Sequence, residues 1–200
     1  MKKRMIFATG NPDKLKEIQM ILSHSEMEII SMKEAGVSDD IIEDGETFEE
    51  NAVIKAKTIM ERTGEIVLAD DSGLEIDFLN KAPGIYSARF MGKDTSYEIK
   101  NAALLEKLSG VPDEERTARF VCAIACAVPD GRILTCSGVM EGIIGYESRG
   151  EHGFGYDPIF YLPECGCYSA ELDPVRKNEL SHRGKALRRM REILLEEGIL

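Results

Sequence analysis

Apolar positions in the first half of the chain alternate between short strand-like runs and stretches with helical spacing. The run MIFATG predicts a strand that ends at Gly10. Apolar residues three or four positions apart then predict a helix over about 12–23, and Pro12 suits its first turn. The run MEIIS predicts a second short strand, so the chain is expected to begin as strand, helix and strand.

A second helix is predicted after an acidic stretch. Thr47 is followed three residues later by Glu50, which is the signature of a capping box. Apolar residues then recur at helical spacing until Gly64, a residue type common at helix ends. The segments EIVLAD and LEIDF predict two further strands separated by the turn residues DSG, and another helix is expected over about 95–108.

From Arg116 onward the helical period of the apolar residues gives way to strand-like runs. The runs RTARFVCAIACAV and RILTCSGVMEGII predict paired strands, joined by the turn sequence PDG. Ser181 is the expected N-cap of a last helix. Strands that alternate with helices, together with one long hairpin, predict an α/β fold with a mixed sheet. We expect a single domain over residues 1–200, with a second lobe at roughly 116–150.

The charge balance narrows the classes of partner. The chain has 25 basic and 36 acidic side chains and a formal net charge of −11, which argues against nucleic-acid polymers and anionic membranes. No apolar run approaches the roughly 20 residues of a membrane span, and the apolar stretch after MKKR is too short for a signal peptide. We therefore expect a cytoplasmic protein whose five cysteines are reduced thiols.

The segment ATGNPDK joins the first predicted strand to the first helix. Backbone N–H groups at such a junction favour an anion, because the N-terminal end of a helix carries partial positive charge. Lys14 lies in the first helical turn, where a cation opposes this dipole unless it holds a bound anion. The segment therefore indicates phosphate binding, although an ordinary turn with a surface lysine has the same pattern.

Two adjacent carboxylates follow the apolar run IVLA. Asp70 and Asp71 are expected at the end of a strand, where α/β sheets bind ligands. Two acids suit Mg²⁺, which takes one or two carboxylates together with phosphate oxygens and water. The alternative is an Asp-Ser-Gly turn between paired strands, in which Ser72 and Gly73 have a purely conformational role.

Three further segments contain candidate ligands. Residues 39–50 include seven acids, of which one or two can reach a metal ion, and Lys55 follows on the same predicted helix. The segment RKNELSHRGKAL is a basic cluster within an acidic chain. In GFGYDPIF, Phe154 can stack on a flat ring while the flanking glycines let the backbone approach a ligand. Solvated surface charges and a turn shaped by Asp157 are the structural alternatives, but together the segments suit a nucleoside triphosphate with Mg²⁺.

Six motifs occur along the chain in the order ATGNPDKLKEI, TFEENAVIKA, LADDSGLEID, APGIYSARF, GFGYDPIF and LSHRGKAL. In this arrangement the whole chain resembles the inosine triphosphate pyrophosphatase family, also called the Ham1 family or the dITP/XTP diphosphatases. The resemblance implies Mg²⁺-dependent hydrolysis of ITP, dITP or XTP to the monophosphate and pyrophosphate, which cleanses the nucleotide pool. It also implies a homodimer and a two-lobed α/β fold whose elongated mixed sheet, with flanking helices, leaves a cleft between the lobes.

The resemblance also implies roles for residues. Catalytic roles fall on Asp71, Lys14 and Lys55, with Asp70 beside Asp71. Asp71 and Glu43 are the implied metal ligands, and whether Asp71 acts as a base or only positions water stays open. The implied substrate-binding residues are Thr9, Gly10, Asn11, Pro12, Asp13, Lys14, Ser72, Phe154, Gly155, Tyr156, Asp157, Lys177, His182 and Arg183.

Selectivity is expected to depend on the 6-keto group of the purine, toward which His182, Arg183 or backbone N–H groups can donate. Lys177 is expected to neutralise triphosphate charge together with the two catalytic lysines.

Two alternative functions remain: a pyrophosphatase for modified pyrimidine triphosphates, as in the Maf family, and a nucleotide-binding module without catalysis. The adjacent Asp70 and Asp71 argue against the second. The stretch CGCYS departs from a Gly-Lys-Thr-like loop of the family, but it contains no assigned residue.

Overall fold

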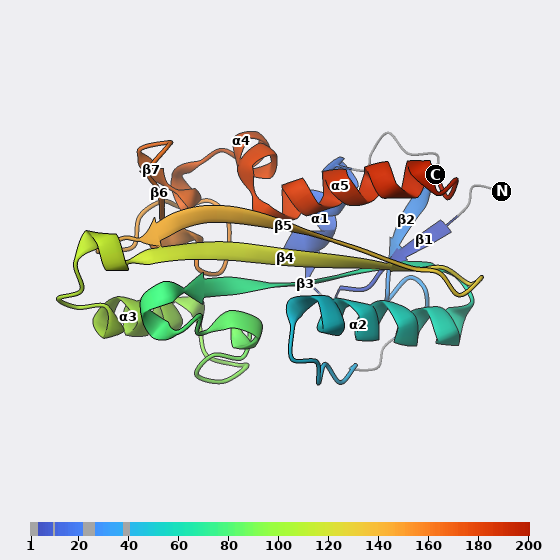
Figure 1. The fold of residues 1–200 in the computed structure, drawn as a ribbon, viewed down its shortest axis with the longest axis horizontal. Helices are drawn as coiled ribbons and strands as arrows, with labels where there is room; N and C mark the ends of the chain where they lie inside the picture. The colour runs from blue at the N-terminus through green and yellow to red at the C-terminus, as the bar shows by residue number, and fades with distance from the viewer. Residues whose placement is uncertain (1–3, 10, 22–26, 38–40) are drawn as a thin grey trace. The chain divides into compact units, whose positions relative to one another are not determined.

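The computed structural model describes residues 4–9, 11–21, 27–37 and 41–200. Within these residues, seven strands form one sheet in the order β2-β1-β3-β4-β5-β6-β7 (Figure 1). β1 is parallel to β2 and β3, whereas β6 is antiparallel to β5 and β7, so the sheet is mixed, as predicted. The strands are β1 (Arg4–Phe7), β2 (Glu28–Ser31), β3 (Ile66–Ile76), β4 (Thr117–Ala127), β5 (Ile133–Ile144), β6 (Phe160–Leu162) and β7 (Cys167–Tyr168).

Helices alternate with the first strands and then close the chain. Among the described helices, none combines the length and the apolar character needed to cross a membrane. The predicted helix at 12–23 begins at Pro12 as expected, and residues 22–26 lie outside the described part of the chain. The α-helices are α1 (Pro12–Ile21), α2 (Phe48–Thr63), α3 (Tyr97–Lys107), α4 (Pro174–Leu180) and α5 (His182–Glu196).

The predicted capping box sets the start of α2. The Thr47 hydroxyl accepts the N–H of Glu50 at 3.1 Å, and the Glu50 carboxylate accepts the N–H of Thr47 at 3.2 Å. At the other end, Gly64 has a φ of 68° and donates its N–H to the carbonyl of Met60 at 2.8 Å. Both ends of α2 are therefore fixed by local sequence, as expected for residues of these types.

The chain divides into two compact units. Unit 1 comprises Met1–Asp71, Cys122–Gly138 and His182–Leu200, and unit 2 comprises Ser72–Val121 and Val139–Ser181. Strands β3, β4 and β5 contribute residues to both units. Each unit has its own cluster of buried apolar side chains.

In unit 1, helices α1 and α5 cover one face of the strands and α2 covers the other (Figure 1). Met5 and Phe7 alternate with Ile6 along β1, and both join a core that includes Ile18 of α1 and Met190 of α5. All of these side chains are almost fully buried. The alternate apolar residues of β1 and the helically spaced apolar residues of α1 and α5 thus pack in one core, as the sequence pattern predicts.

In unit 2, α3 packs its apolar face on the core formed by the strands. Leu104 of α3 is fully buried in a cluster with Leu74 of β3 and Phe160 of β6. The rings of Phe120 and Phe160 lie with their centroids 4.5 Å apart. This core includes Tyr156 and so supports the loop described below, which begins at Gly153.

A buried arginine ties several backbone segments of unit 2 together. Arg116 is 1% exposed, and its guanidinium donates to the carbonyl oxygens of Leu108 and Ile144, each at 2.7 Å, and also to that of Gly145. It lies 4.2 Å from the ring centroid of Tyr146. The side chain of Arg116 therefore connects the C-terminal end of α3 to the C-terminal end of β5.

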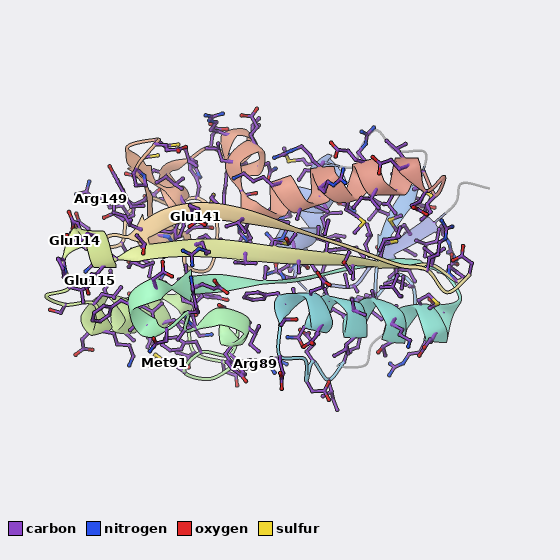
Figure 2. All side chains as sticks on the ribbon, viewed as in Figure 1. Arg89, Met91, Glu114, Glu115, Glu141 and Arg149 are labelled. Atoms are coloured by element: carbon purple, nitrogen blue, oxygen red, sulfur yellow. The ribbon has the colours of Figure 1, made fainter. Side chains whose placement is uncertain are left out.

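An ion-pair network joins the turn after β3 to strands β4 and β5 in unit 2. Both guanidinium Nη atoms of Arg119 donate to Asp77, at 3.0 and 2.9 Å, and its Nε lies 3.1 Å from Glu141, which Figure 2 shows on β5. Thr117 donates its hydroxyl to Asp77 at 2.7 Å. Hydrogen bonds from Arg119, Lys81 and Thr117 hold the pKa of Asp77 well below its usual range.

All five cysteines are free thiols. Cys122 and Cys126 are buried in β4, and burial raises the pKa of Cys126 to about 12. Burial also raises the pKa of Cys136 to about 11 and raises that of Cys167. Cys165 is exposed in the turn between β6 and β7.

Candidate active site

The structure corrects the predicted location of the acid pair. Asp70 and Asp71 do not follow the end of a strand, because β3 runs without interruption from Ile66 to Ile76. The predicted Asp-Ser-Gly turn is therefore wrong, and Ser72 continues the strand, partly buried. The pairing of β3 with parallel β1 nevertheless stops at Leu68, so the two acids lie just beyond the carboxyl end of β1.

Asp70 is the centre of a buried charge cluster in unit 1. Its side chain is 1% exposed, and its Oδ2 lies 2.8 Å from Lys14 Nζ and 3.4 Å from Arg183 Nε. Lys55 donates to the backbone carbonyl of the same residue at 2.9 Å. Burial raises the pKa of Asp70, but the charges of Lys14, Arg183 and Lys55 outweigh burial and hold the pKa well below the usual range.

Asp71 lies in a different electrostatic environment. Its Oδ2 accepts a hydrogen bond of 3.1 Å from the side-chain amide of Asn51, on α2. Burial raises the pKa of Asp71, Lys55 and the amide of Asn51 lower it in part, and the carboxylate of Glu43 raises it further. Glu43 itself pairs with Lys55 at 3.1 Å. The structure thus brings the two predicted metal ligands and both predicted catalytic lysines into one cluster.

The turn between β1 and α1 uses its polar side chains to cap the helix. Thr9 Oγ1 accepts the N–H of Asn11 at 3.1 Å, and Asn11 Oδ1 accepts the N–H of Lys14 at 3.4 Å. Pro12 occupies the first helical position, as predicted. Two of the N–H groups that we expected to face an anion therefore have partners within the turn. Two predicted contacts, Gly10 and the side chain of Asp13, lie outside the described part of the chain.

The first turn of α5 places its predicted site residues in the interior. Arg183 is 3% exposed, and its guanidinium donates to the carboxylate of Glu17 on α1 as well as to Asp70. His182 is also buried. A Cβ atom at Gly138 of β5 would lie 2.3 Å from the carbonyl oxygen of His182, so only glycine allows this approach. These contacts fix the start of α5 against the strands of unit 1.

The loop GFGYD in unit 2 is held by its own aspartate. Asp157 is buried, and its Oδ2 accepts the N–H of Phe154 at 2.8 Å and lies 2.6 Å from Lys177 Nζ. Its Oδ1 accepts the hydroxyl of Ser169 at 2.8 Å. Both carboxylate oxygens therefore have partners in the chain, which favours the second of the two roles considered for Asp157, that of shaping the turn.

The same loop places two predicted substrate residues side by side. Lys177 Nζ lies 4.9 Å from the ring centroid of Phe154. Gly153 and Gly155 have φ values of 77° and 70°, a region that side chains other than glycine rarely adopt. Tyr156, in contrast, is buried, and its hydroxyl donates to the carbonyl of Ser87 at 2.7 Å. The structure therefore gives Tyr156 a role in supporting the loop.

Few described side chains of the candidate site are placed to coordinate a metal ion. Among the residues that the structure describes, no group of three or more His, Cys, Asp or Glu side chains is arranged to hold a metal ion. Mg²⁺ requires fewer protein ligands, because it is often bound by one or two carboxylates together with substrate phosphates and water. The proximity of Asp71 and Glu43, two carboxylates that repel each other electrostatically, fits such a site.

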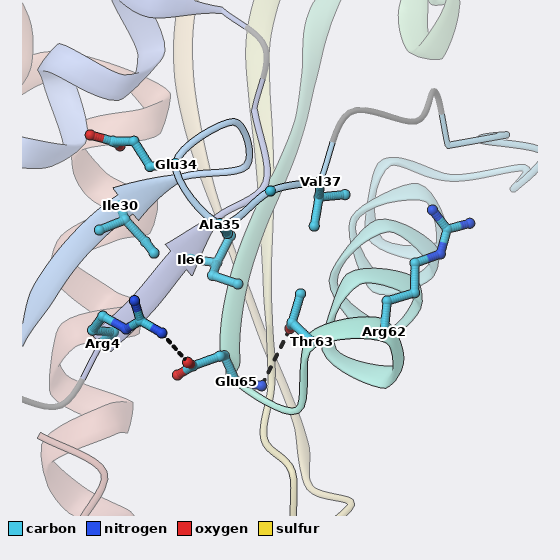
Figure 3. Close-up of a pocket in the computed structure, with 10 residues that line it drawn as sticks. Arg4, Ile6, Ile30, Glu34, Ala35, Val37, Arg62, Thr63 and Glu65 are labelled. Carbon is cyan, nitrogen blue, oxygen red and sulfur yellow. Dashed lines mark hydrogen bonds and ion pairs between the residues drawn. The ribbon is translucent and has the colours of Figure 1, made fainter.

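A separate hollow lies at the strand edge of unit 1 (Figure 3). This cavity has a volume of about 390 Å³. Ile6 and Ile30 contribute apolar surface, and Arg62 and an ion pair of 2.6 Å between Arg4 and Glu65 contribute charge. None of the predicted site residues that the structure describes lines it, so it is distinct from the acid cluster.

Comparison with known proteins decides the family. The Ham1 family matches residues 5–193. The chain belongs to the Ham1 family. A dITP/XTP pyrophosphatase of Desulforamulus reducens is 50% identical over 191 residues, which are 96% of this chain and 95% of that protein. A HAM1 protein from Coxiella burnetii is 44% identical with a TM-score of 0.89, over 97% of this chain and 99% of that one. The Staphylococcus aureus Ham1 protein reaches the same TM-score at 37% identity, over 98% and 100% of the two chains.

Two polar residues of this Ham1 chain were missed by the sequence analysis. Asn51 is fully buried on the apolar face of α2, next in sequence to the buried Ala52, and it also accepts the N–H of Gly45 at 2.9 Å. A polar residue in a predicted core position is the signal that could have found it. Glu17 had no such signal, because its partner Arg183 comes from a helix 166 residues away in sequence.

Proposed function

We propose that the protein is a nucleoside-triphosphate pyrophosphohydrolase that converts ITP, dITP and XTP to the monophosphate and pyrophosphate. The relative from Desulforamulus reducens carries the name dITP/XTP pyrophosphatase. The observation that carries the proposal is the cluster in unit 1, where the carboxylates of Asp71 and Glu43 lie beside the ammonium group of Lys55. This combination of acids and cations suits a phosphate substrate that arrives with a divalent cation.

The lysines of the cluster have donors left for phosphate oxygens. An ammonium group has three N–H donors. Lys14 uses a contact with Asp70 in the structure, and Lys55 uses contacts with the carbonyl of Asp70 and with Glu43. Asp70 thereby holds both lysines in place while their charge remains available, and they neutralise the charge that develops on the leaving pyrophosphate.

Asp71 and Glu43 are the residues that would hold Mg²⁺ in this proposal. The ion, when bound, neutralises phosphate charge and lowers the pKa of a coordinated water molecule. In the reaction, a water oxygen forms a bond to the α-phosphorus while the bond from this phosphorus to the α–β bridging oxygen breaks. The electron pair leaves with pyrophosphate and the proton lost by the water passes to bulk solvent, while Asp71, held by the amide of Asn51, positions the attacking water.

The loop of unit 2 is the proposed site for the purine. Phe154 offers a ring face, and Gly155 keeps the backbone close to it without a side chain. Selectivity for a 6-keto purine requires a donor aimed at that oxygen, since an amine there would leave the donor unpaired. His182, Arg183 and backbone N–H groups are the proposed donors.

Release of pyrophosphate from ITP, with and without Mg²⁺, tests the proposal. We expect release that needs Mg²⁺ and a kcat/KM for ITP that exceeds that for ATP by roughly 100-fold or more. A panel of ITP, dITP, XTP, GTP, ATP and modified pyrimidine triphosphates separates this activity from its alternatives. Equal kcat/KM for ITP and ATP, or a preference for a pyrimidine, would contradict the proposal, and binding without turnover would indicate a nucleotide-binding module.

We also propose a cytoplasmic homodimer. The support is the Ham1 family, for which the sequence resemblance implies two copies. Light scattering of the purified chain should give twice the mass of 22.2 kDa. A mass that stays at the monomer value across the concentration range would contradict the dimer, whereas cell fractionation tests the location.

A further inference from the structure

A buried asparagine of α3 contacts the backbone of the loop GFGYD. Asn101 is 3% exposed, and its Nδ2 donates a hydrogen bond of 3.2 Å to the carbonyl oxygen of Gly155. Gly155 is one of the two loop residues in the left-handed region of backbone conformation. The hydrogen bond therefore restrains the loop at a residue whose backbone, lacking a side chain, is otherwise free to adopt several conformations.

The same face of α3 contacts the loop a second time. Tyr97 lies four residues before Asn101, so the two side chains share one face of the helix. The ring of Tyr97 packs edge-on against that of Tyr156, with centroids 5.1 Å apart and planes at 89°. A ring carbon of Tyr97 would lie 3.6 Å from a Cβ atom at position 155. Helix α3 thus supports two consecutive loop residues, Gly155 and Tyr156.

Phe154 lies between two sets of anchors along the chain. Its own N–H is held by Asp157, which is bound in turn by Lys177 and Ser169. The residue after it is held by Asn101. Because the backbone is fixed on both sides of Phe154, the direction of its ring depends on both contacts.

The identity of residue 101 is not explained by packing alone. Within the part of the chain that the structure describes, Asn101 Oδ1 has no hydrogen-bond partner although it is buried. A buried acceptor without a partner costs free energy, and leucine at this position would avoid that cost. The asparagine therefore contributes through its other group, the Nδ2 donor that the Gly155 carbonyl accepts.

We propose that Asn101 is a positioning residue for base selection, which holds the Gly155 carbonyl and through it the ring of Phe154. The proposal rests on the proposed function only in naming the ligand of the loop as a purine. The mechanical part, that Asn101 restrains Phe154, is independent of any activity.

A fluorescent reporter tests the mechanical part. The chain has no tryptophan, so Phe154→Trp places a single indole in the loop. We expect Asn101→Leu in this background to lower the anisotropy of the indole and to raise its acrylamide quenching constant about twofold, because the loop loses one anchor. Asn101→Gln keeps the amide and should restore part of the parent signal. Leu105→Ala, one turn further along α3, is the control for a weaker helix contact.

The results of the reporter decide the proposal directly. A larger change in Asn101→Leu than in Leu105→Ala, with recovery in Asn101→Gln, supports it. The same anisotropy and quenching in Asn101→Leu as in the parent, or an equal change in Leu105→Ala, would overturn it. Circular dichroism of every variant confirms that the comparison is made on folded protein.

Kinetics on the chain with Phe154 intact test the link to base selection. The loss of one hydrogen bond should raise KM for ITP roughly threefold to tenfold, with kcat within about twofold. The preference for ITP over ATP should fall by a similar factor. If Asn101→Leu lowers kcat and leaves KM unchanged, Asn101 does not position the base. If the unaltered chain releases no pyrophosphate, the proposed function fails while the reporter result still stands.

Discussion

Asp70 and Asp71 are adjacent in β3, yet the pKa values of their carboxyl groups are shifted in opposite directions, that of Asp70 downward and that of Asp71 upward. Lys14, Arg183 and Lys55 stabilise the ionised form of Asp70. Burial and the nearby carboxylate of Glu43 disfavour the ionised form of Asp71. Because alternate residues of a strand point to opposite faces, two neighbouring acids can have separate environments and separate roles.

Asp71→Asn should lower activity without lowering stability. We expect kcat for ITP to fall by roughly 100-fold or more, since the variant loses the carboxylate that positions water and would hold the cation. The free energy of unfolding should stay the same or rise, because a partly buried charge beside Glu43 is removed and the amide of Asn51 keeps an acceptor. Pyrophosphate release and urea denaturation measure the two effects. Near-normal turnover would contradict the proposed role of Asp71 in the reaction.

Asp70→Asn, unlike Asp71→Asn, should lower the free energy of unfolding. The substitution leaves Lys14 and the buried guanidinium of Arg183 without their shared carboxylate. Removing one partner of a buried ion pair costs about 3 kcal/mol, so the urea midpoint should fall clearly. Asp94→Asn, at an exposed acid, is the control. An unfolding free energy equal to that of the control would show that the cluster does not depend on Asp70.

The acid sensitivity of unit 2 should depend on Asp77. Its pKa is lowered by hydrogen bonds from Arg119, Lys81 and Thr117, so its contribution to stability is complete above the unfolded pKa of about 3.9. The contribution is lost as the pH falls through the native pKa. We expect Asp77→Asn to be less stable by about 1 kcal/mol at pH 7 and to lose less stability on acidification. Urea midpoints at pH 7 and pH 3 measure this, and parallel curves for parent and variant would contradict it.

Arg116→Met should destabilise the chain although it preserves most of the side-chain volume. The carbonyl oxygens of Leu108, Ile144 and Gly145 would lose a buried donor. We expect a loss of about 3 kcal/mol in the free energy of unfolding. Arg116→Lys should recover only part of this loss, because one ammonium group cannot reach all the carbonyls that the planar guanidinium reaches. A methionine variant as stable as the parent would contradict this role.

The sequence predicted the elements whose signals are local. The capping box of Thr47 and Glu50 sets the start of α2, and the last helix begins directly after Ser181. The prediction failed at residues 70–73, where turn-forming types lie in a continuous strand. Turn propensity is a weak local preference, and pairing with neighbouring strands overrides it. The short helix α4, seven residues long, was also missed.

The sequence predicted which residues belong to the candidate site, but not which of their side chains contact one another. The motifs indicated Lys14, Lys55 and the acid pair, and the structure brings them together in unit 1. Nothing local indicates that Lys177 binds Asp157, because the two residues are 20 positions apart and meet only through the folded loop. Such contacts follow from tertiary packing, which a single sequence does not reveal.

The cysteines make the chain convenient to label. Cys122 and Cys126 are buried, and the pKa values of Cys136 and Cys167 are raised, so little of these thiols is in the reactive thiolate form at neutral pH. Cys165 is the exposed thiol, in a turn of unit 2. A dye or spin label can therefore be attached to unit 2 of the unaltered chain, where its signal would report whether a bound nucleotide affects this unit.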